Sequence, residues 1–164
     1  MSLTELRTFV PAGSIVVTSG TETLMTVGLG SCVAVVLDDP AARVGGVAHV
    51  VLPGGTRGDR PGQPGRYATS AIPLLVERVV AAGGRRARLR ARLIGGATMF
   101  PELLAPGAVS LGTRNLAAVR SLLEEYRIPV VGEDTGGNHG RSVAFRPADG
   151  RVVVRSVRGA EVEV

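Results

Sequence analysis

Residues 26–55 read TVGLGSCVAVVLDDPAARVGGVAHVVLPGG and contain two short segments rich in β-branched residues, 32–38 and 44–52. The turn-forming residues 39–42 between them predict a β-hairpin. If residue 38 pairs with residue 43, Cys32 lies directly opposite His49, with Cβ atoms about 4.5–5.5 Å apart. A shift of one residue would turn the two side chains to opposite faces, so this juxtaposition depends on the register.

Cys32 is the only cysteine of the chain and His49 one of two histidines, and the pair favours nucleophilic catalysis. A thiol with a pKa near 8.5 is mostly protonated at neutral pH, and a neighbouring imidazole can accept its proton. Gly30 and Ser31 precede the cysteine and allow a tight turn whose N–H groups face a developing oxyanion. Thr26 offers a hydroxyl or a carbonyl group that orients the histidine.

Each of these residues also has a structural interpretation. A lone cysteine behaves as a small buried hydrophobe, and a histidine within an apolar run suits a core position. Thr26 alone suits an ordinary strand. Together with the distant His139, Cys32 and His49 form no recognisable four-ligand pattern, so we predict no metal site.

Similar patterns continue on both sides of the hairpin. Strands are predicted at 14–19, 24–28, 86–96, 128–134, 142–147 and 151–157, the last two joined as a hairpin by the turn signal ADG. Apolar residues at helical spacing predict two helices, at 69–84 and 112–126. Two main helices packed on a mixed, mostly antiparallel sheet make an α+β domain.

Two segments of this plan carry local signals. In the first helix, Ser70 is the expected N-cap, Pro73 falls in the first turn, and Gly83 and Gly84 end the helix. Residues 53–66, PGGTRGDRPGQPGR, contain five glycines and three prolines. No regular element fits them, so we predict a mobile loop.

Composition limits the function classes. The 164 residues fit a single domain, 1–164, and no apolar run is long enough to cross a bilayer. The first residues do not resemble a signal peptide and one cysteine cannot form an internal disulfide, which predicts a cytoplasmic protein. All 19 basic residues are Arg and the net charge is +5, which suits an acidic partner. With five aromatic residues, nucleic-acid binding is only a third interpretation.

Two glycine clusters, GGATMF (95–100) and GGNHGRS (136–142), lack the pattern of a phosphate loop and are typical of tight turns. Their functional interpretation is a rim around the Cys32 cleft. In that case Gly95 and Gly96 shape the rim, and Asn138 or Arg141 contacts a substrate or partner. The arginines that alternate along 86–92 predict a solvated strand face or a patch for an acidic partner.

Several motifs, taken in order, resemble the chemoreceptor glutamine deamidases of the CheD family. They are TVGLGSCVAVVLDDP, GGVAHVVLP, PGRYATSA, LIGGATMF, GTRNLAAV, EDTGGNHGRSV and VVVRSV, which span about residues 13–157. The resemblance implies a layered α/β sandwich. It also implies that Cys32 is the nucleophile, His49 the general base and acid, and Thr26 the residue that orients His49. GGNHG carries His139 where members often have another residue, so we assign His139 no role.

The resemblance further implies a reaction and its partners. A receptor glutamine becomes glutamate through a thioester, without metal, nucleotide or organic cofactor. The same acyl-enzyme forms from a glutamate methyl ester, which predicts an esterase side activity. The expected partners are methyl-accepting chemotaxis receptors and a CheC-type phosphatase, with no nucleic acid and no membrane insertion. The alternative is a non-catalytic adaptor that docks on receptors and on such a phosphatase.

Overall fold

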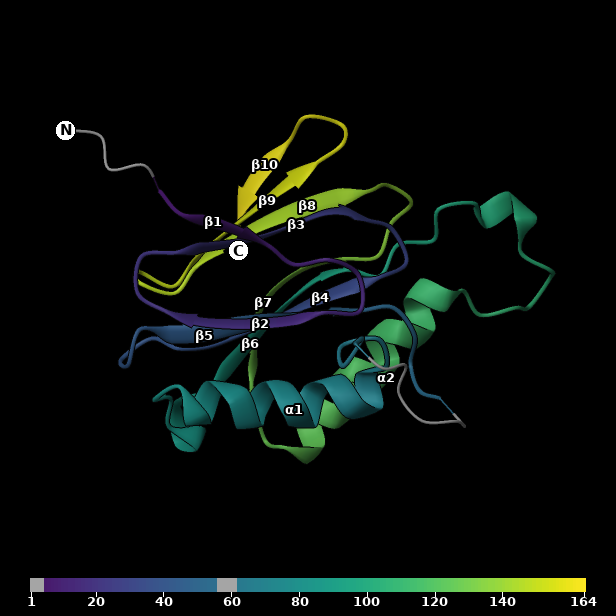
Figure 1. Cartoon of the computed structure of the whole chain (residues 1–164). Helices are drawn as coiled ribbons and strands as arrows, with labels where there is room; N and C mark the ends of the chain where they lie inside the picture. Colours follow the sequence, from purple (N-terminus) through teal and green to yellow (C-terminus); the bar gives the residue numbers. More distant parts are fainter. Residues whose placement is uncertain (1–4, 56–61) are drawn as a thin grey trace.

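The computed structural model describes residues 5–55 and 62–164 as two stacked β-sheets with both helices on one side (Figure 1). One sheet has the strand order β1-β3-β8-β9-β10 and the other β2-β5-β4-β6-β7. The strands are β1 (Arg7–Phe9), β2 (Ile15–Ser19), β3 (Thr23–Leu29), β4 (Val33–Asp39), β5 (Val44–Val50), β6 (Arg90–Gly95), β7 (Val130–Thr135), β8 (Arg141–Arg146), β9 (Arg151–Ser156) and β10 (Glu161–Glu163). The helices are α1 (Ala68–Ala81) and α2 (Leu111–Glu125). The predicted α+β sandwich is confirmed, with two sheets in place of one.

The β4–β5 hairpin lies inside the second sheet, but its predicted register is wrong by two residues. Val33 pairs with Val50, and Asp39 with Val44. The turn keeps four residues but lies one position later, at 40–43, because the Asp39 carboxylate accepts bonds from the N–H groups of Ala41 and Ala42 and the strand extends to Asp39. A shift of two keeps every side chain on its predicted face.

Two apolar layers hold the fold together. Leu24, Val36, Val47 and Phe145 belong to a buried cluster between the two sheets. A second cluster joins the other face of β4 and β5 to the apolar sides of α1 and α2. Gly45 lies on β5 at a close approach of the sheets, because a Cβ atom there would come within 2.6 Å of the Phe145 ring. Both faces of the hairpin are therefore buried.

The helices lie where the apolar spacing predicts them, but the start of α1 differs. Its N-cap is Tyr67, and Ser70 lies inside the helix with its hydroxyl donating to the Tyr67 carbonyl. Pro73 consequently lies beyond the first turn. The helix begins early because the Ala68 N–H bonds to the carbonyl of Leu52 and so starts from the end of the hairpin. The C-terminal prediction holds, since α1 ends at Ala81 and Gly83 follows with φ +118°.

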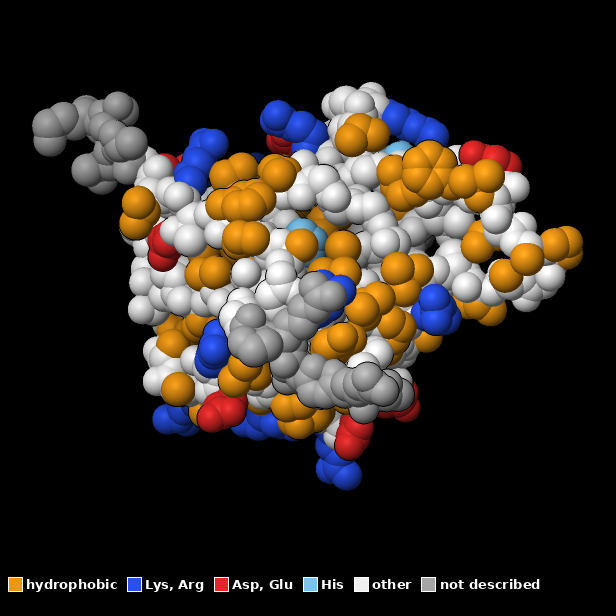
Figure 2. Space-filling model, turned by 45° about the vertical axis from the view of Figure 1, so that its right-hand side comes forward, with side chains coloured by type: hydrophobic (Ala, Val, Ile, Leu, Met, Phe, Trp, Pro, Cys, Tyr) orange, Lys and Arg blue, Asp and Glu red, His pale blue; other side chains and the backbone are white. Residues whose placement is uncertain are grey.

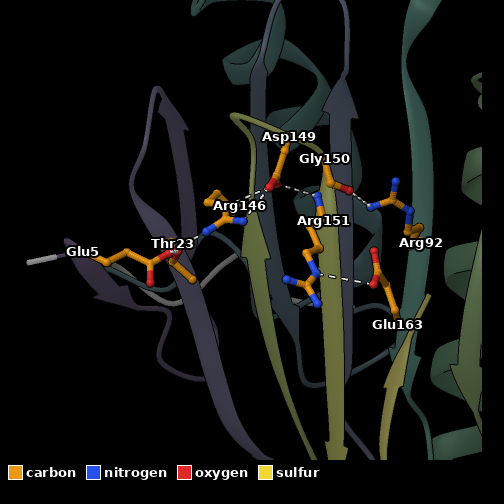
Figure 3. Close-up of polar contacts among 8 residues, drawn as sticks. All are labelled: Glu5, Thr23, Arg92, Arg146, Asp149, Gly150, Arg151 and Glu163. Carbon is orange, nitrogen blue, oxygen red and sulfur yellow. Dashed lines mark hydrogen bonds and ion pairs between the residues drawn. The ribbon is translucent and has the colours of Figure 1, made fainter. Parts of the chain in front are cut away.

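The predicted strand at 86–96 divides into two parts, and its arginines do not share one solvated face, because Arg86 and Arg88 are exposed but Arg92 is buried. Residues Arg86–Arg88 form a 3₁₀ turn before β6, which lies buried between β4 and β7. Arg92 is 6% exposed and crosses to the other sheet, where its Nη1 donates to the Gly150 carbonyl at 2.7 Å (Figure 3). Both faces of β6 are buried, so the alternation of arginine with apolar residues along this strand does not indicate a solvent-exposed face.

The predicted 142–157 hairpin is confirmed as β8 and β9. Strands β1 and β10 are short edge strands that no sequence signal indicated. Of the predicted mobile loop 53–66, residues 56–61 lie outside the described residues. In the described part of the chain, neither helix has the length and apolarity needed to cross a membrane.

Candidate active site

Cys32 lies one residue before β4, at the end of the hairpin where the two strands separate. Continuing the observed register places it opposite Val51 and diagonal to His49. Cys32 packs against the cluster between the sheets that contains Val47, so it shares a face with His49. Diagonal neighbours lie about 7–8 Å apart, within reach of longer side chains. The direct opposition predicted from the sequence is wrong, but the shared face is retained.

His49 is 4% exposed, and two groups hold its Nδ1 atom. The Thr26 hydroxyl lies at 3.0 Å and the Val10 carbonyl at 3.2 Å. A carbonyl oxygen only accepts, so Nδ1 carries the proton and donates. This tautomer leaves Nε2 as a proton acceptor.

Thr26 comes from β3 in the other sheet, where it pairs with Val143 just before a bulge that ends at Leu29. The sequence predicts Thr26 as the residue that orients His49, but it does not indicate Val10. Val10 precedes Pro11 and is fully buried, and its N–H bonds to the Met25 carbonyl. A main-chain carbonyl has no residue-type signature, so no pattern in the sequence identifies it.

Burial sets the protonation of the pair. It raises the pKa of the Cys32 thiol above its ordinary value, although a bond from the residue's own N–H acts in the opposite direction. It lowers the pKa of His49, against the opposing effect of the Val10 carbonyl. Both shifts favour uncharged groups at neutral pH, a thiol and a neutral imidazole.

The first glycine cluster closes one side of the Cys32 segment. The Gly96 N–H donates to the Cys32 carbonyl at 2.8 Å and the Ala97 N–H to the Gly30 carbonyl at 2.9 Å. Gly95 has φ +108°, and a Cβ atom there would lie 2.2 Å from the Cys32 oxygen, so only glycine fits. Ser31 and Cys32 are both partly exposed.

The second cluster lies against the first. The Thr98 N–H bonds to the Gly137 carbonyl, and the Gly136 N–H to the Gly95 carbonyl. Arg141 is 2% exposed and donates to the Gly136 carbonyl at 2.8 Å, so it holds this turn from inside. Asn138 is exposed and accepts a bond from Arg158. The two clusters therefore meet beside Cys32, with Arg141 buried and Asn138 facing solvent.

An apolar segment extends from this site. Between β6 and α2 the chain projects from the body of the molecule, and hydrophobic side chains gather on the projection (Figures 1 and 2). They include Phe100, Leu103 and Val109, which are 63%, 78% and 60% exposed. Met99 begins the segment and packs over Gly30, where a Cβ atom would lie 3.1 Å from its Cγ. We call residues 99–109 the apolar projection.

Other features lie away from this site. A hollow of about 420 Å³ on the outer face of the first sheet is lined by Arg7, Arg146, Arg151 and Arg155, and not by Cys32, His49 or Thr26. All four arginines form ion pairs with carboxylates, among them Arg151 with Glu163 (Figure 3). Over residues 5–55 and 62–164, no group of three or more His, Cys, Asp or Glu side chains is arranged to hold a metal ion.

Comparison with known proteins supplies independent evidence. The family model described as CheD chemotactic sensory transduction matches residues 51–156. This match begins two residues after His49, so it does not depend on Thr26, Cys32 or His49.

Curated relatives extend over more of the chain. A chemoreceptor glutamine deamidase CheD of Thermotoga maritima is 43% identical over 138 residues, 84% of this chain and 84% of that protein. A probable chemoreceptor glutamine deamidase CheD of Clostridium novyi is 41% identical over 134 residues, 82% of this chain and 83% of that protein. With a family model that matches well over half of its length and relatives this similar, the chain belongs to the CheD family.

Proposed function

We propose that this protein hydrolyses the side-chain amide of glutamine residues in chemoreceptors, with Cys32 as nucleophile. The observation that carries the proposal is the position of His49. Its Nδ1 is held by Thr26 and Val10, while its ring shares a face with the only thiol of the chain. The names of the relatives, chemoreceptor glutamine deamidases, supply the substrate class.

The first half of the reaction forms a thioester. His49 Nε2 accepts the thiol proton while the Cys32 sulfur attacks the amide carbon, so charge develops only when substrate is present. We assign stabilisation of the oxyanion to backbone N–H groups of the turn at Gly30 and Ser31. Protonated His49 then gives its proton to the departing nitrogen, and ammonia leaves.

The second half returns the enzyme to its starting state. His49 takes a proton from water, and the hydroxide attacks the thioester carbon. The carbon–sulfur bond breaks, glutamate is released, and the sulfur recovers its proton from His49. The cycle starts from an uncharged pair because burial raises the pKa of Cys32 and lowers the pKa of His49. The same thioester would form from a glutamate methyl ester, so we retain the esterase side activity as a prediction.

The apolar projection supports a protein substrate. Its exposed side chains begin at Met99, beside Gly30, and so border the turn that precedes Cys32. Exposed apolar patches beside a site are typical of protein contacts. The net charge of +5 suits an acidic receptor surface in the cytoplasm. A CheC-type phosphatase remains a predicted second partner, to be tested by co-purification with the natural protein and with Phe100→Ser.

The direct test is mass spectrometry of receptor cytoplasmic domains after incubation with the protein. We expect glutamine-to-glutamate conversion at defined positions with the natural chain and none with Cys32→Ala. Ser19→Ala is the matched control, because Ser19 is an exposed residue at the end of β2 and its loss should leave conversion unchanged. If several receptor domains show no conversion while still binding the protein, the non-catalytic adaptor is the better account.

A further inference from the structure

Asn115 is a buried polar residue that the reaction described above does not use. It lies in the second turn of α2 and is fully buried. Its neighbours along the helix, Leu116 and Val119, pack with apolar residues of α1 and the second sheet. A buried amide needs hydrogen-bond partners, so its contacts show what it does.

The Asn115 amide joins the two chain segments of the active site. Its Nδ2 donates to the Ser31 carbonyl and to the Val51 carbonyl, each at 2.9 Å. Ser31 immediately precedes Cys32, and Val51 lies two residues after His49. One side chain therefore contacts the segments that carry the nucleophile and the base.

These contacts occur where the hairpin ladder stops. The last paired residues are Val33 and Val50. Beyond them the Val51 N–H turns away to the Arg66 carbonyl, and the Cys32 carbonyl accepts from Gly96. The strand ends no longer bond to each other, and the Asn115 amide bridges the gap.

The chemistry of the amide fixes its orientation. Two carbonyl oxygens accept but never donate, so only the NH₂ group can face both of them. The Oδ1 atom is then buried, and it has no hydrogen-bond partner within the described residues. A buried acceptor without a partner is costly, which distinguishes this residue from one retained only for packing.

We propose that Asn115 is a positioning residue, whose Nδ2 group sets the separation between the Cys32 and His49 segments at the open end of the hairpin. This inference rests on the proposed function of that pair. Loss of the bridge leaves both side chains present but frees the two strand ends to move apart. Effects should therefore appear in the coupling of thiol to imidazole and in kcat, and not in KM.

The test measures how strongly His49 affects alkylation of Cys32 by iodoacetamide, with and without Asn115. In the natural background we expect His49→Ala to slow alkylation at least about five-fold. In the Asn115→Ala background we expect this effect to fall below about two-fold. Deamidation of a receptor domain by Asn115→Ala should show a kcat lower by about ten-fold or more, with KM within about two-fold.

Val119→Ala is the matched control, because Val119 is equally buried one turn further along the same helix. It should leave the His49 effect on alkylation unchanged. If Asn115→Ala does not fold, the same measurement is made with Asn115→Ser, which keeps one hydrogen-bond donor. In that background His49→Ala should slow the alkylation of Cys32 less than it does in the natural chain.

The outcomes separate this inference from the proposed function. If His49→Ala still slows alkylation of Cys32 in the Asn115 variant, the positioning role alone is overturned. The same holds if Val119→Ala removes this slowing equally. If His49→Ala has no effect even in the natural background, the proposed Cys32–His49 chemistry fails, and the inference fails with it.

Discussion

The β4–β5 hairpin has a closed end at residues 38–45 and an open end at Cys32 and His49. The two ends differ in the charge state of their buried polar groups. At the closed end the buried carboxylates of Asp38 and Asp39 form ion pairs with Arg90 and Arg88. At the open end the burial shifts of Cys32 and His49 favour an uncharged thiol and imidazole. Fixed charges hold one end closed, while the other keeps two neutral groups that can exchange a proton.

At the closed end a side chain of the hairpin itself satisfies main-chain N–H groups. Asp39 accepts from Arg85 N–H at 2.8 Å and from the turn residues Ala41 and Ala42. At the open end the main chain relies on distant partners, such as Gly96 and Asn115. One hairpin therefore separates stability from chemistry, and changes at its two ends should have different consequences.

The largest expected effect is at the open end. Cys32→Ser should lower the deamidation rate by at least about 1,000-fold, because the hydroxyl is a far weaker nucleophile than the thiol. The unfolding midpoint in urea should change little, since the replacement is nearly isosteric. Quantitative mass spectrometry of a receptor domain checks the rate. Deamidation that survives in Cys32→Ser would place the chemistry elsewhere.

A smaller effect is expected from the group that orients the base. Thr26→Val keeps the shape but removes the hydroxyl 3.0 Å from His49 Nδ1. The Val10 carbonyl still holds the ring, so we expect kcat to fall by about ten-fold. Steady-state deamidation kinetics measure it. Thr18→Val is the control, because Thr18 bonds to Glu22 away from the site and its loss should leave kcat unchanged.

At the closed end the expected loss is in stability. Asp39→Asn removes the charge that Arg88 and the Arg85 N–H contact, and should lower the free energy of unfolding by about 2 kcal/mol. Urea denaturation measures this loss. The deamidation rate of the folded variant should match that of the natural chain. An activity loss as large as that of Thr26→Val would show that the two ends are not separable.

Strong acid should weaken the closed end through the same carboxylate. Burial by itself raises the pKa of Asp39, but hydrogen bonds from Arg88, Arg85 and Ala42 outweigh it and lower the pKa to about 2. Because the folded pKa lies below the ordinary 3.8, this stabilisation is present above pH 3.8 and is lost as the pH falls toward 2. Urea titrations over that pH range should show that the free energy of unfolding declines more steeply with falling pH in the natural chain than in Asp39→Asn.

The smallest effect is the acid response of the open end. Burial lowers the pKa of His49 from 6.5, so the unfolded chain binds a proton more readily than the folded one. Stability should therefore fall as the pH drops below 6.5, and His49→Gln should flatten that slope. Urea unfolding between pH 8 and pH 5 measures the difference. Equal slopes in the two chains would argue against a buried neutral His49.

Much of this arrangement was predictable from the sequence, for physical reasons. Strand and helix positions follow from apolar periodicity, and the shared face of Cys32 and His49 survives because a register error of two preserves strand parity. The residues that the sequence did not predict act through a main-chain group or through contacts with segments remote in the sequence. Val10 contributes a carbonyl, and Asn115 lies on a helix remote in sequence from both strands. Arg92 alternates as surface residues do but crosses between the sheets.

Stoichiometric alkylation of Cys32 tests whether the thiol at the open end carries out the reaction. The chain has one cysteine, so iodoacetamide can label one defined thiol. The deamidation rate on a receptor domain is measured as a function of the fraction of chains labelled, and intact-mass spectrometry gives that fraction. We predict a linear fall to zero at one label per chain. A fully labelled, folded chain that still deamidates the receptor would show that Cys32 is not the nucleophile.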